Sequence, residues 1–205
     1  MVTSPLLSKF SWIEHGFGTR LDVIDQDTMA SLDQIHSARI LRADRAGRAG
    51  SADALITNTP DLAISIRTAD CLPILLADPR HRAVTAVHAG WRGSAEQIVC
   101  RTIDEMRSEF DTSPQEIVAA IGPGIGKCCY EVGEEVGRKF GLDSAGKIDL
   151  AAINREQLMN SGVRTSQIDT LDACTMCDAE RWWSYRRDRE AAGRMISWIR
   201  IRTPK

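Results

Sequence analysis

The amino-acid sequence predicts an α+β fold in which mixed sheets and helices are arranged in layers. Strand-like segments outnumber helical ones, and the two kinds do not alternate strictly, which argues against a parallel, doubly wound sheet. Each predicted strand is rich in Val, Ile or Leu and is bounded by turn-forming residues. The predicted strands are Ala38–Leu41, Asp53–Ile56, Leu62–Ile66, Leu72–Ala77, Ala83–Val87, Glu116–Ile121 and Met195–Ile201.

Three segments are predicted to be helices. In Ala95–Phe110 the apolar residues recur about every 3.6 positions, which places them on one face of a helix. Ser94 and Gln97 form a capping box at its start, because their side chains can satisfy free backbone N–H groups there. The other two helices are predicted over Glu131–Phe140, which ends at Gly141, and Leu150–Met159.

Composition limits the class of protein. The 205 residues include 43% hydrophobic and 26% charged residues, which is typical of a globular protein, and we predict one domain over residues 1–205. A net charge of −2 does not favour nucleic-acid binding, and no apolar run approaches the roughly 18–20 residues of a membrane span. Without a recognisable secretory signal, the six cysteines are expected to be reduced in the cytoplasm. The sequence does not predict an oligomeric state.

A hairpin register places a cysteine opposite a histidine. Two apolar runs flank Asp78–His81, a good turn with Pro79 at its second position. If Asp78 faces His81, then Cys71 lies directly opposite His88. Directly opposed residues share one face of a sheet, with Cβ atoms about 4.5–5.5 Å apart, so a thiolate and an imidazole could bind one metal ion. A one-residue bulge would break this register.

A third ligand is needed for a metal site of this kind. His81 lies in the proposed turn, which leaves His15 and His36, and His36 stands in an irregular segment just before a strand. Three ligands with one open coordination position are typical of catalytic zinc. The alternative is that Cys71 is a small buried apolar residue and that each histidine is structural.

Two glycine-containing segments follow predicted strands, and one of them could bind an anion. Gly90-Trp91-Arg92-Gly93 leads into a predicted helix, where free N–H groups favour phosphate, Arg92 could hold an anion and Trp91 could stack on a base. From spacing alone, a tight turn with a packed tryptophan is favoured over this interpretation. The segment Gly122–Gly126 is neither a dinucleotide-binding motif nor a P-loop, and it indicates only that the backbone approaches a substrate or another strand.

The remaining cysteines could form a second site. Cys174 and Cys177 form a Cys-x-x-Cys motif, which together with Cys128 and Cys129 could make a four-thiolate zinc site. The adjacent pair has the wrong spacing for a zinc knuckle, so the sequence argues against this site. A thioredoxin-like role is also disfavoured, because no helix clearly begins at Cys174.

Together, these motifs resemble the YfiH-like family, also called the laccase-domain or multicopper polyphenol oxidase family. They occur in family order over almost the whole chain. The matching segments are His15–Arg20, Gln34–Ser37, Thr68–Pro73, His88–Gly93, Gly122-Pro123, Cys128–Gly133, Cys174-Thr175 and Ser184–Asp188.

The resemblance implies a layered α/β/β/α fold and an active-site metal held by His36, Cys71 and His88. It further implies a zinc-dependent purine nucleoside phosphorylase acting on adenosine, inosine, guanosine and methylthioadenosine, with adenosine deaminase as a side activity. One departure is a shortened N-terminal region. Family members usually carry a Gly-Gly-Val-Ser loop and a further helix, whereas here only about a dozen residues separate Arg20 from Gln34.

The resemblance therefore implies a metal enzyme whose partners are a nucleoside and phosphate. The predicted substrate or phosphate ligands are Trp91, Arg92, Gly122, Arg186 and Arg194. A competing hypothesis is copper-dependent phenol oxidation, since thiolate and imidazole also suit copper, but four histidines are few for several copper ions. Two further hypotheses are that the enzyme hydrolyses peptidoglycan precursors and that the chain is a binding protein without activity.

Overall fold

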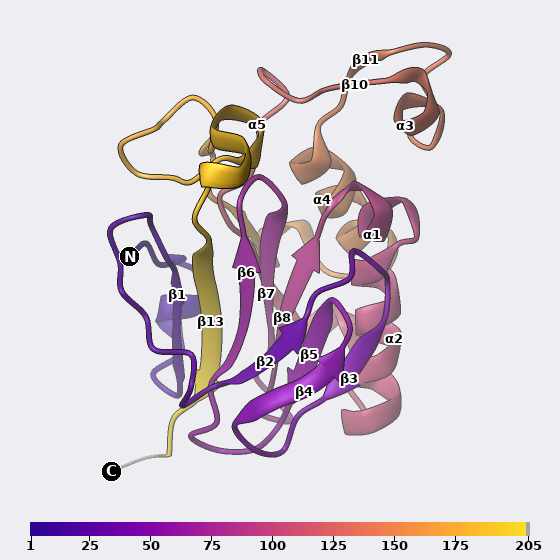
Figure 1. Ribbon diagram of the computed structural model, residues 1–205. Coiled ribbons are helices and arrows are strands. Elements are labelled where there is room, and N and C mark those ends of the chain that lie inside the picture. Colours follow the sequence, from indigo (N-terminus) through magenta and orange to yellow (C-terminus); the bar gives the residue numbers. More distant parts are fainter. Residues whose placement is uncertain (204–205) are drawn as a thin grey trace.

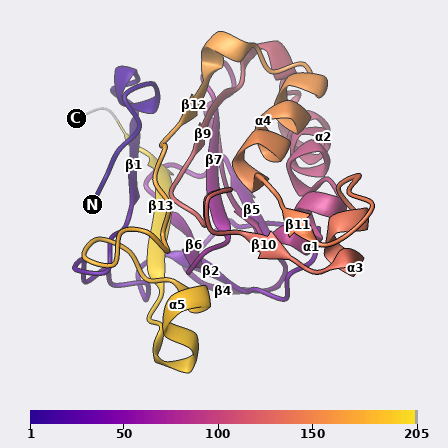
Figure 2. The same cartoon turned by 90° about the horizontal axis from the view of Figure 1, so that it is seen from above.

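The computed structural model describes residues 1–203 and confirms the α+β class with mixed sheets. Two sheets pack face to face, and the helices α1, α2 and α4 cover the outer face of the larger sheet (Figures 1 and 2). The helix α5 (Tyr185–Asp188) lies across one end of both sheets (Figure 1). Within the described residues, no helix is long and apolar enough to cross a membrane.

The larger sheet has six strands in the order β12-β9-β7-β8-β5-β3, and the smaller has five in the order β1-β13-β6-β2-β4. The strands of the larger sheet are Ile40–Arg42 (β3), Ala54–Thr57 (β5), Leu72–Asp78 (β7), Ala83–Ala89 (β8), Val118–Ile121 (β9) and Ile168–Thr170 (β12). Those of the smaller sheet are Ile13–Phe17 (β1), Ala30–Asp33 (β2), Gly47–Ser51 (β4), Ile64–Thr68 (β6) and Met195–Ile201 (β13). A separate pair joins Glu131–Val132 (β10) to Gly146–Lys147 (β11).

All seven predicted strands are present, with ends shifted by a few residues. The strands β1, β2, β4 and β12 were not predicted, and three of them lie at a sheet edge. The strand β4 is Gly-Arg-Ala-Gly-Ser and is mostly exposed. Edge strands are often short and polar, so they lack the apolar pattern that marks a buried strand.

The predicted helix over Ala95–Phe110 is interrupted. Trp91–Ala95 forms α1 and Ile98–Phe110 forms α2, because Gln97 takes a left-handed conformation with φ 59°. The capping-box prediction was wrong: Ser94 lies inside α1, and its hydroxyl accepts a hydrogen bond from Asn154 at 2.8 Å. This bond to α4 fixes the side chain between two helices instead of at a helix start.

The other two helices differ in how well they match the sequence. The helix α4 spans Leu150–Asn160 and begins at Asp149, whose carboxylate accepts a hydrogen bond from the Ala152 N–H. The predicted helix over Glu131–Phe140 shortens to α3, Glu134–Arg138. Its first residues instead form β10. Short 3-10 turns cover Leu7–Lys9, Pro114–Glu116, Thr165–Gln167 and Arg189–Ala191.

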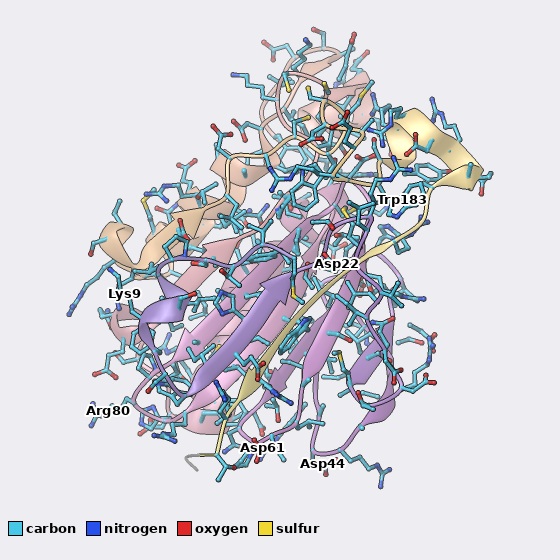
Figure 3. All side chains as sticks on the ribbon, turned by 90° about the vertical axis from the view of Figure 1, so that its left-hand side faces the viewer. Lys9, Asp22, Asp44, Asp61, Arg80 and Trp183 are labelled. Atoms are coloured by element: carbon cyan, nitrogen blue, oxygen red, sulfur yellow. The ribbon has the colours of Figure 1, made fainter. Side chains whose placement is uncertain are left out.

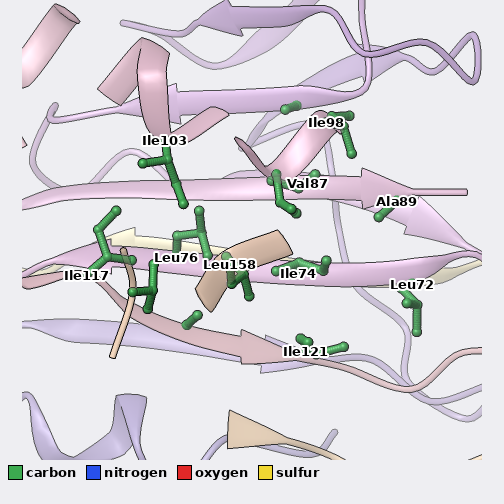
Figure 4. Close-up of a cluster of buried hydrophobic side chains, with 14 of the residues drawn as sticks. Leu72, Ile74, Leu76, Val87, Ala89, Ile98, Ile103, Ile117, Ile121 and Leu158 are labelled. Carbon is green, nitrogen blue, oxygen red and sulfur yellow. The ribbon is translucent and has the colours of Figure 1, made fainter. Parts of the chain in front are cut away.

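The core lies on both faces of the larger sheet. Every residue of β7 and β8 is buried, because one face packs under the helices and the other against the smaller sheet. Figure 4 shows the helix side, where Ile74, Leu76 and Val87 meet Ile98 and Ile103. Full burial of each such side chain contributes roughly 1.5–3 kcal/mol to folding, so the two central strands are firmly held.

The observed register of the β7–β8 hairpin differs from the predicted one by two residues. Pro73, not Cys71, is opposite His88, and Asp78 pairs with Ala83 around a four-residue turn. The Asp78 carboxylate accepts hydrogen bonds from two backbone N–H groups of the turn and from the His81 ring, which stabilises the wider loop. Because side chains alternate with a period of two, a two-residue shift keeps Cys71 on the same face as His88.

Candidate metal centre and adjoining cavity

The structure brings His36, Cys71 and His88 together at the end of the sheets beneath α5. Cys71 directly precedes β7, His88 is near the end of β8, and His36 lies in the loop after β2. Their metal-binding atoms lie within 4.8 Å of one another, and the two imidazole rings meet edge to face with centroids 4.9 Å apart. The three residues predicted from the sequence therefore form one cluster.

A buried carboxylate that was not predicted from the sequence positions both histidines. Asp53, just before β5, is fully buried, and its Oδ1 accepts hydrogen bonds from His36 N at 3.0 Å and from His88 Nδ1 at 2.7 Å. Because Nδ1 of His88 is engaged, Nε2 is left to bind a metal. Burial opposes ionisation of Asp53, but hydrogen bonds from His88 and Ser37 outweigh it and lower the pKa of this carboxyl group. A lone aspartate among Ala52, Ala54 and Leu55 is the signal that could have revealed it.

The loop that carries His36 depends on the same carboxylate. His36 has φ 57°, a left-handed conformation that is costly for a residue with a Cβ and that persists only where its surroundings enforce it. Asp53 Oδ2 accepts from the Ile35 and Ser37 N–H groups at 3.3 and 2.6 Å and from the Ser37 hydroxyl at 2.7 Å. These bonds hold the loop in the conformation that aims His36 at Cys71.

Gly90 leaves the space that the cluster needs. A Cβ at this position would lie 2.9 Å from Cys71 Sγ and 3.5 Å from Cδ2 of His36. The glycine thus allows the backbone to pass beside the thiolate.

The charges of the cluster suit metal binding. Burial raises the pKa of Cys71, but the charge of His88 and hydrogen bonding with His36 and His88 outweigh burial and lower it to about 6. Burial lowers the pKa of His88, but the Cys71 thiolate and Asp53 outweigh this and raise it to about 9. A metal ion would displace the proton from His88 and bind the ready thiolate. One thiolate and two imidazoles are a donor set that fits zinc or copper.

A cavity of about 940 Å³ adjoins the cluster. Four of its lining residues are arginines: Arg67, Arg186, Arg189 and Arg194. Arg186 and Arg194 were predicted from the sequence as ligands of substrate or phosphate. The other lining residues are Gln34, His36, Thr68, Ala69, Asp70, Cys71, His88, Ile125, Tyr130, Tyr185, Glu190 and Ala192. The cavity therefore has a positive wall next to the candidate metal centre.

Three predicted ligands are not among the residues that line this cavity. Two of them, Trp91 and Arg92, contact each other: the Arg92 guanidinium lies 4.5 Å from the Trp91 ring centroid. Gly122 does not line the cavity either. A Cβ there would lie 2.3 Å from the Phe17 ring and 2.8 Å from Pro73, so this glycine allows close packing of the two sheets.

A second buried carboxylate fixes the wall that carries the arginines. Asp70 accepts hydrogen bonds from the Thr175 hydroxyl and from the Arg186 N–H, both at 2.6 Å. The Arg186 guanidinium donates twice to the Glu131 carbonyl at 3.0 Å and lies 5.5 Å from the Tyr130 ring centroid. Burial, reinforced by the Cys71 charge, raises the pKa of Tyr130 to about 12, so its hydroxyl remains a hydrogen-bond donor.

The two other histidines are engaged elsewhere. His15 accepts a hydrogen bond from the Ser4 N–H at 2.9 Å, and burial lowers its pKa. His81 pairs with Asp78 in the hairpin turn. Neither belongs to the cluster around Cys71.

The four cysteines that the sequence disfavours as a zinc site nevertheless lie together in the structure. Cys128, Cys129, Cys174 and Cys177 have sulfur atoms within 4.8 Å of one another. The spacing rule for a zinc knuckle describes ligands from one local loop. Here two loops far apart in the sequence meet, joined by a parallel bridge between Gly124 and Cys174.

Comparison with known proteins gives consistent results. A family model for multi-copper polyphenol oxidoreductase laccases matches residues 17–202. A purine nucleoside phosphorylase of Bacteroides thetaiotaomicron is 41% identical over 163 residues, which are 73% of this chain and 60% of that protein. One of Clostridium acetobutylicum is 38% identical over 178 residues, or 82% of this chain and 75% of that protein. This chain thus spans less than two thirds of the Bacteroides relative.

A solved structure shares the fold. The crystal structure of the Bacillus licheniformis hypothetical protein YfiH superposes with a TM-score of 0.82 at 31% identity, covering 87% of this chain and 76% of that one. With the family model matching residues 17–202, the chain belongs to the laccase-like, YfiH-type family of multi-copper polyphenol oxidoreductases.

Proposed function

We propose that this chain is a purine nucleoside phosphorylase that depends on a zinc ion held by His36, Cys71 and His88. The observation that carries the proposal is the placement of this donor set beside a cavity with four arginines. The cavity volume of about 940 Å³ is at the upper end of the range of about 300–1,000 Å³ for small-molecule sites. The names of the Bacteroides and Clostridium relatives support the same activity.

The arginine wall supplies the phosphate site. In the described part of the chain, the guanidinium groups of Arg186 and Arg194 donate to backbone carbonyls and not to carboxylates. Their positive charges are therefore free to attract an anion. Guanidinium and phosphate form paired, charge-assisted hydrogen bonds of about 2.7–2.9 Å, so these side chains can both bind and orient phosphate.

Other lining groups suit the nucleoside. The Tyr130 hydroxyl, which stays protonated, can donate to the base or the sugar. Glu190 accepts a hydrogen bond from Tyr185 at 3.0 Å and can accept others from ribose hydroxyls. These residues would hold the anomeric carbon of the ribose next to the phosphate bound by Arg186 and Arg194, which raises the effective concentration of the reactants.

The reaction replaces one bond to the sugar by another. A phosphate oxygen attacks the anomeric carbon, and the bond to the purine nitrogen breaks with its electron pair leaving on the base. The nitrogen then takes a proton, and the products are ribose 1-phosphate and the free purine. When bound, zinc supplies a Lewis acid with an open coordination position, while Asp53 keeps His36 and His88 oriented toward it.

The expected substrates are adenosine, inosine, guanosine and methylthioadenosine. With water in place of phosphate, attack at C6 of adenosine with loss of ammonia would give a deaminase side activity. Both reactions would use the same cavity, so a single set of variants tests them together.

The test is chromatography of products formed by metal-quantified protein from adenosine, with and without phosphate. We expect adenine only when phosphate is present, and inosine in smaller amounts without it. Cys71→Ala should abolish both products, whereas Cys100→Ala, at a half-buried cysteine on α2 outside the cluster, should not. Absence of both products from protein that contains one zinc ion per cluster would refute the proposal, and copper in place of zinc would favour phenol oxidation.

A further inference from the structure

We propose that Cys128, Cys129, Cys174 and Cys177 bind a second zinc ion, one that is structural and is separate from the ion at His36, Cys71 and His88. Four of the six cysteines of the chain form this cluster. All four ligands would come from protein, and a closed tetrahedral set of four thiolates is typical of structural zinc.

The distances between sulfur atoms fit a metal site. Cys177 Sγ lies 3.3 Å from Cys129 Sγ and 3.6 Å from Cys128 Sγ, and all four sulfur atoms lie within 4.8 Å of one another. Zinc–sulfur bonds of about 2.3 Å in a tetrahedron separate the sulfur atoms by about 3.8 Å. A disulfide requires about 2.05 Å, so the thiols are spaced as ligands are and not as a bonded pair.

The surroundings of the sulfur atoms are those of a metal site. The Gly126 N–H donates to Cys174 Sγ at 3.2 Å, and hydrogen bonds of this kind orient metal ligands and stabilise their charge. A Cβ on Gly126 would lie 3.3 Å from Cys128 Sγ and 3.2 Å from the Cβ of Cys174. The Lys147 ammonium donates to the Cys128 carbonyl at 2.9 Å, which brings a positive charge beside the four cysteines.

Packing alone does not explain the cluster. Cys128 and Cys177 are exposed, Cys129 and Cys174 are half-buried, and none of the four belongs to either hydrophobic core. Small apolar residues would gain little from gathering at the surface. A metal ion explains why four thiols from two distant loops converge there.

The position of the site indicates its role. Tyr130 directly follows Cys129 and lines the cavity. Thr175 stands between the other two cysteines, and its hydroxyl donates to Asp70, the neighbour of Cys71. The ion would thus join the loop that carries Tyr130 to the loop that is bonded to the base of β7. Between these two loops the chain passes through β10, α3, β11, α4 and β12. An ion bound by both loops would cross-link them directly and would rigidify this wall of the cavity.

Metal counting in variants tests the proposal without relying on activity. Binding releases the thiol protons, so the ion should be removable by chelation or by acid. We expect two zinc ions per chain in the wild type, one in Cys71→Ala, one in Cys177→Ser and none in the double variant. Cys100→Ser is the matched control and should keep two. If Cys71→Ala retains no metal, or if Cys177→Ser loses none relative to the wild type, the second site is refuted.

Two further measurements do not rely on variants of the four-cysteine cluster itself. Cobalt exchanged into Cys71→Ala should show the intense sulfur-to-metal charge-transfer absorption of four thiolates. In the native wild type, the four cluster thiols should resist alkylation until a chelator is added, although two of them are exposed. Rapid alkylation of all four before chelation, or an intact mass that shows a disulfide among them, would overturn the proposal.

Discussion

Replacing Asp53 by asparagine should weaken metal binding while leaving the ligands themselves in place. Aspartate and asparagine have nearly the same shape, but asparagine has one acceptor oxygen where Asp53 has two. If the oxygen stays on the side of Ser37, the amide NH₂ group faces His36 N–H and His88 Nδ1, and two hydrogen bonds are lost. Hydrogen bonds to a charged group contribute about 1.5–3 kcal/mol each, so the combined loss is roughly 3–6 kcal/mol.

Part of this loss should appear in metal affinity. To accept from the new NH₂ group, His88 would have to move its proton to Nε2, the atom that binds metal. Loss of such a supporting carboxylate typically lowers metal affinity by about 10–100-fold. The remainder should appear as a lower free energy of unfolding, since His36 keeps its strained conformation only through these bonds.

The assay is a zinc titration against a competing chelator, together with denaturant unfolding of the metal-free protein. Asp78→Asn is the matched control, because Asp78 is also fully buried and also accepts hydrogen bonds from a backbone N–H and a histidine ring. It lies in the hairpin turn at the other end of β7, so it should lose stability but keep zinc affinity. Equal zinc affinity in Asp53→Asn and Asp78→Asn would refute the role assigned to Asp53.

Three other perturbations test separate parts of the structure. Gly90→Ala should lower zinc affinity by on the order of tenfold, because the added Cβ would lie 2.9 Å from Cys71 Sγ. Gly133→Ala is the control: no atom lies within 4 Å of its added Cβ, so the same titration should show unchanged zinc affinity. Arg186→Gln should raise the KM for phosphate by about tenfold or more in steady-state kinetics, which is the equivalent of one charge-assisted hydrogen bond. Arg80 lies at the far end of the sheets from Trp183 and α5 (Figure 3), so Arg80→Gln should leave the KM for phosphate unchanged. Burial raises the pKa of the Asp78 carboxyl group, but hydrogen bonds from the His81 ring and from the His81 and Arg80 N–H groups outweigh burial and lower this pKa. Its contribution to stability is therefore present above the unfolded pKa of about 3.9 and is lost as the pH falls through the lower folded value. The free energy of unfolding of Asp78→Asn should accordingly decrease less steeply than that of the wild type as the pH falls below about 4. The same pH dependence in both proteins would contradict this prediction.

The sequence predicted the central strands and the three candidate metal ligands, because both depend on local patterns. Runs such as Leu72–Ala77 are apolar on both faces, which marks a buried strand. Side chains alternate between the two faces of a strand, so the two-residue error in the hairpin register still left Cys71 and His88 on the same face. Contacts between distant segments were not visible in these patterns. The apolar pattern predicts a strand that begins at Asp53, and it does not reveal the partners that a buried carboxylate must have. The break at Gln97 and the meeting of the two cysteine pairs likewise depend on tertiary contacts, with α4 in one case and through the Gly124–Cys174 bridge in the other.

The two halves of the cavity are held in different ways, and this should separate metal binding from substrate binding. Cys71, His88 and Asp53 stand at the ends of fully buried strands, where the packed core fixes them. Arg186 belongs to the short helix α5 and Arg189 to the 3-10 turn that follows it, neither of which contains a buried residue. Arg194 directly precedes β13, and the Arg186 N–H is bonded to Asp70. Loss of the bonds to Asp70 should therefore move the arginines and raise the KM for phosphate while the zinc content stays constant. Loss of the bonds to Asp53 should do the reverse, because it acts on the ligands and leaves the arginine wall intact. A variant of either carboxylate that changed both quantities equally would show that the cavity behaves as one unit.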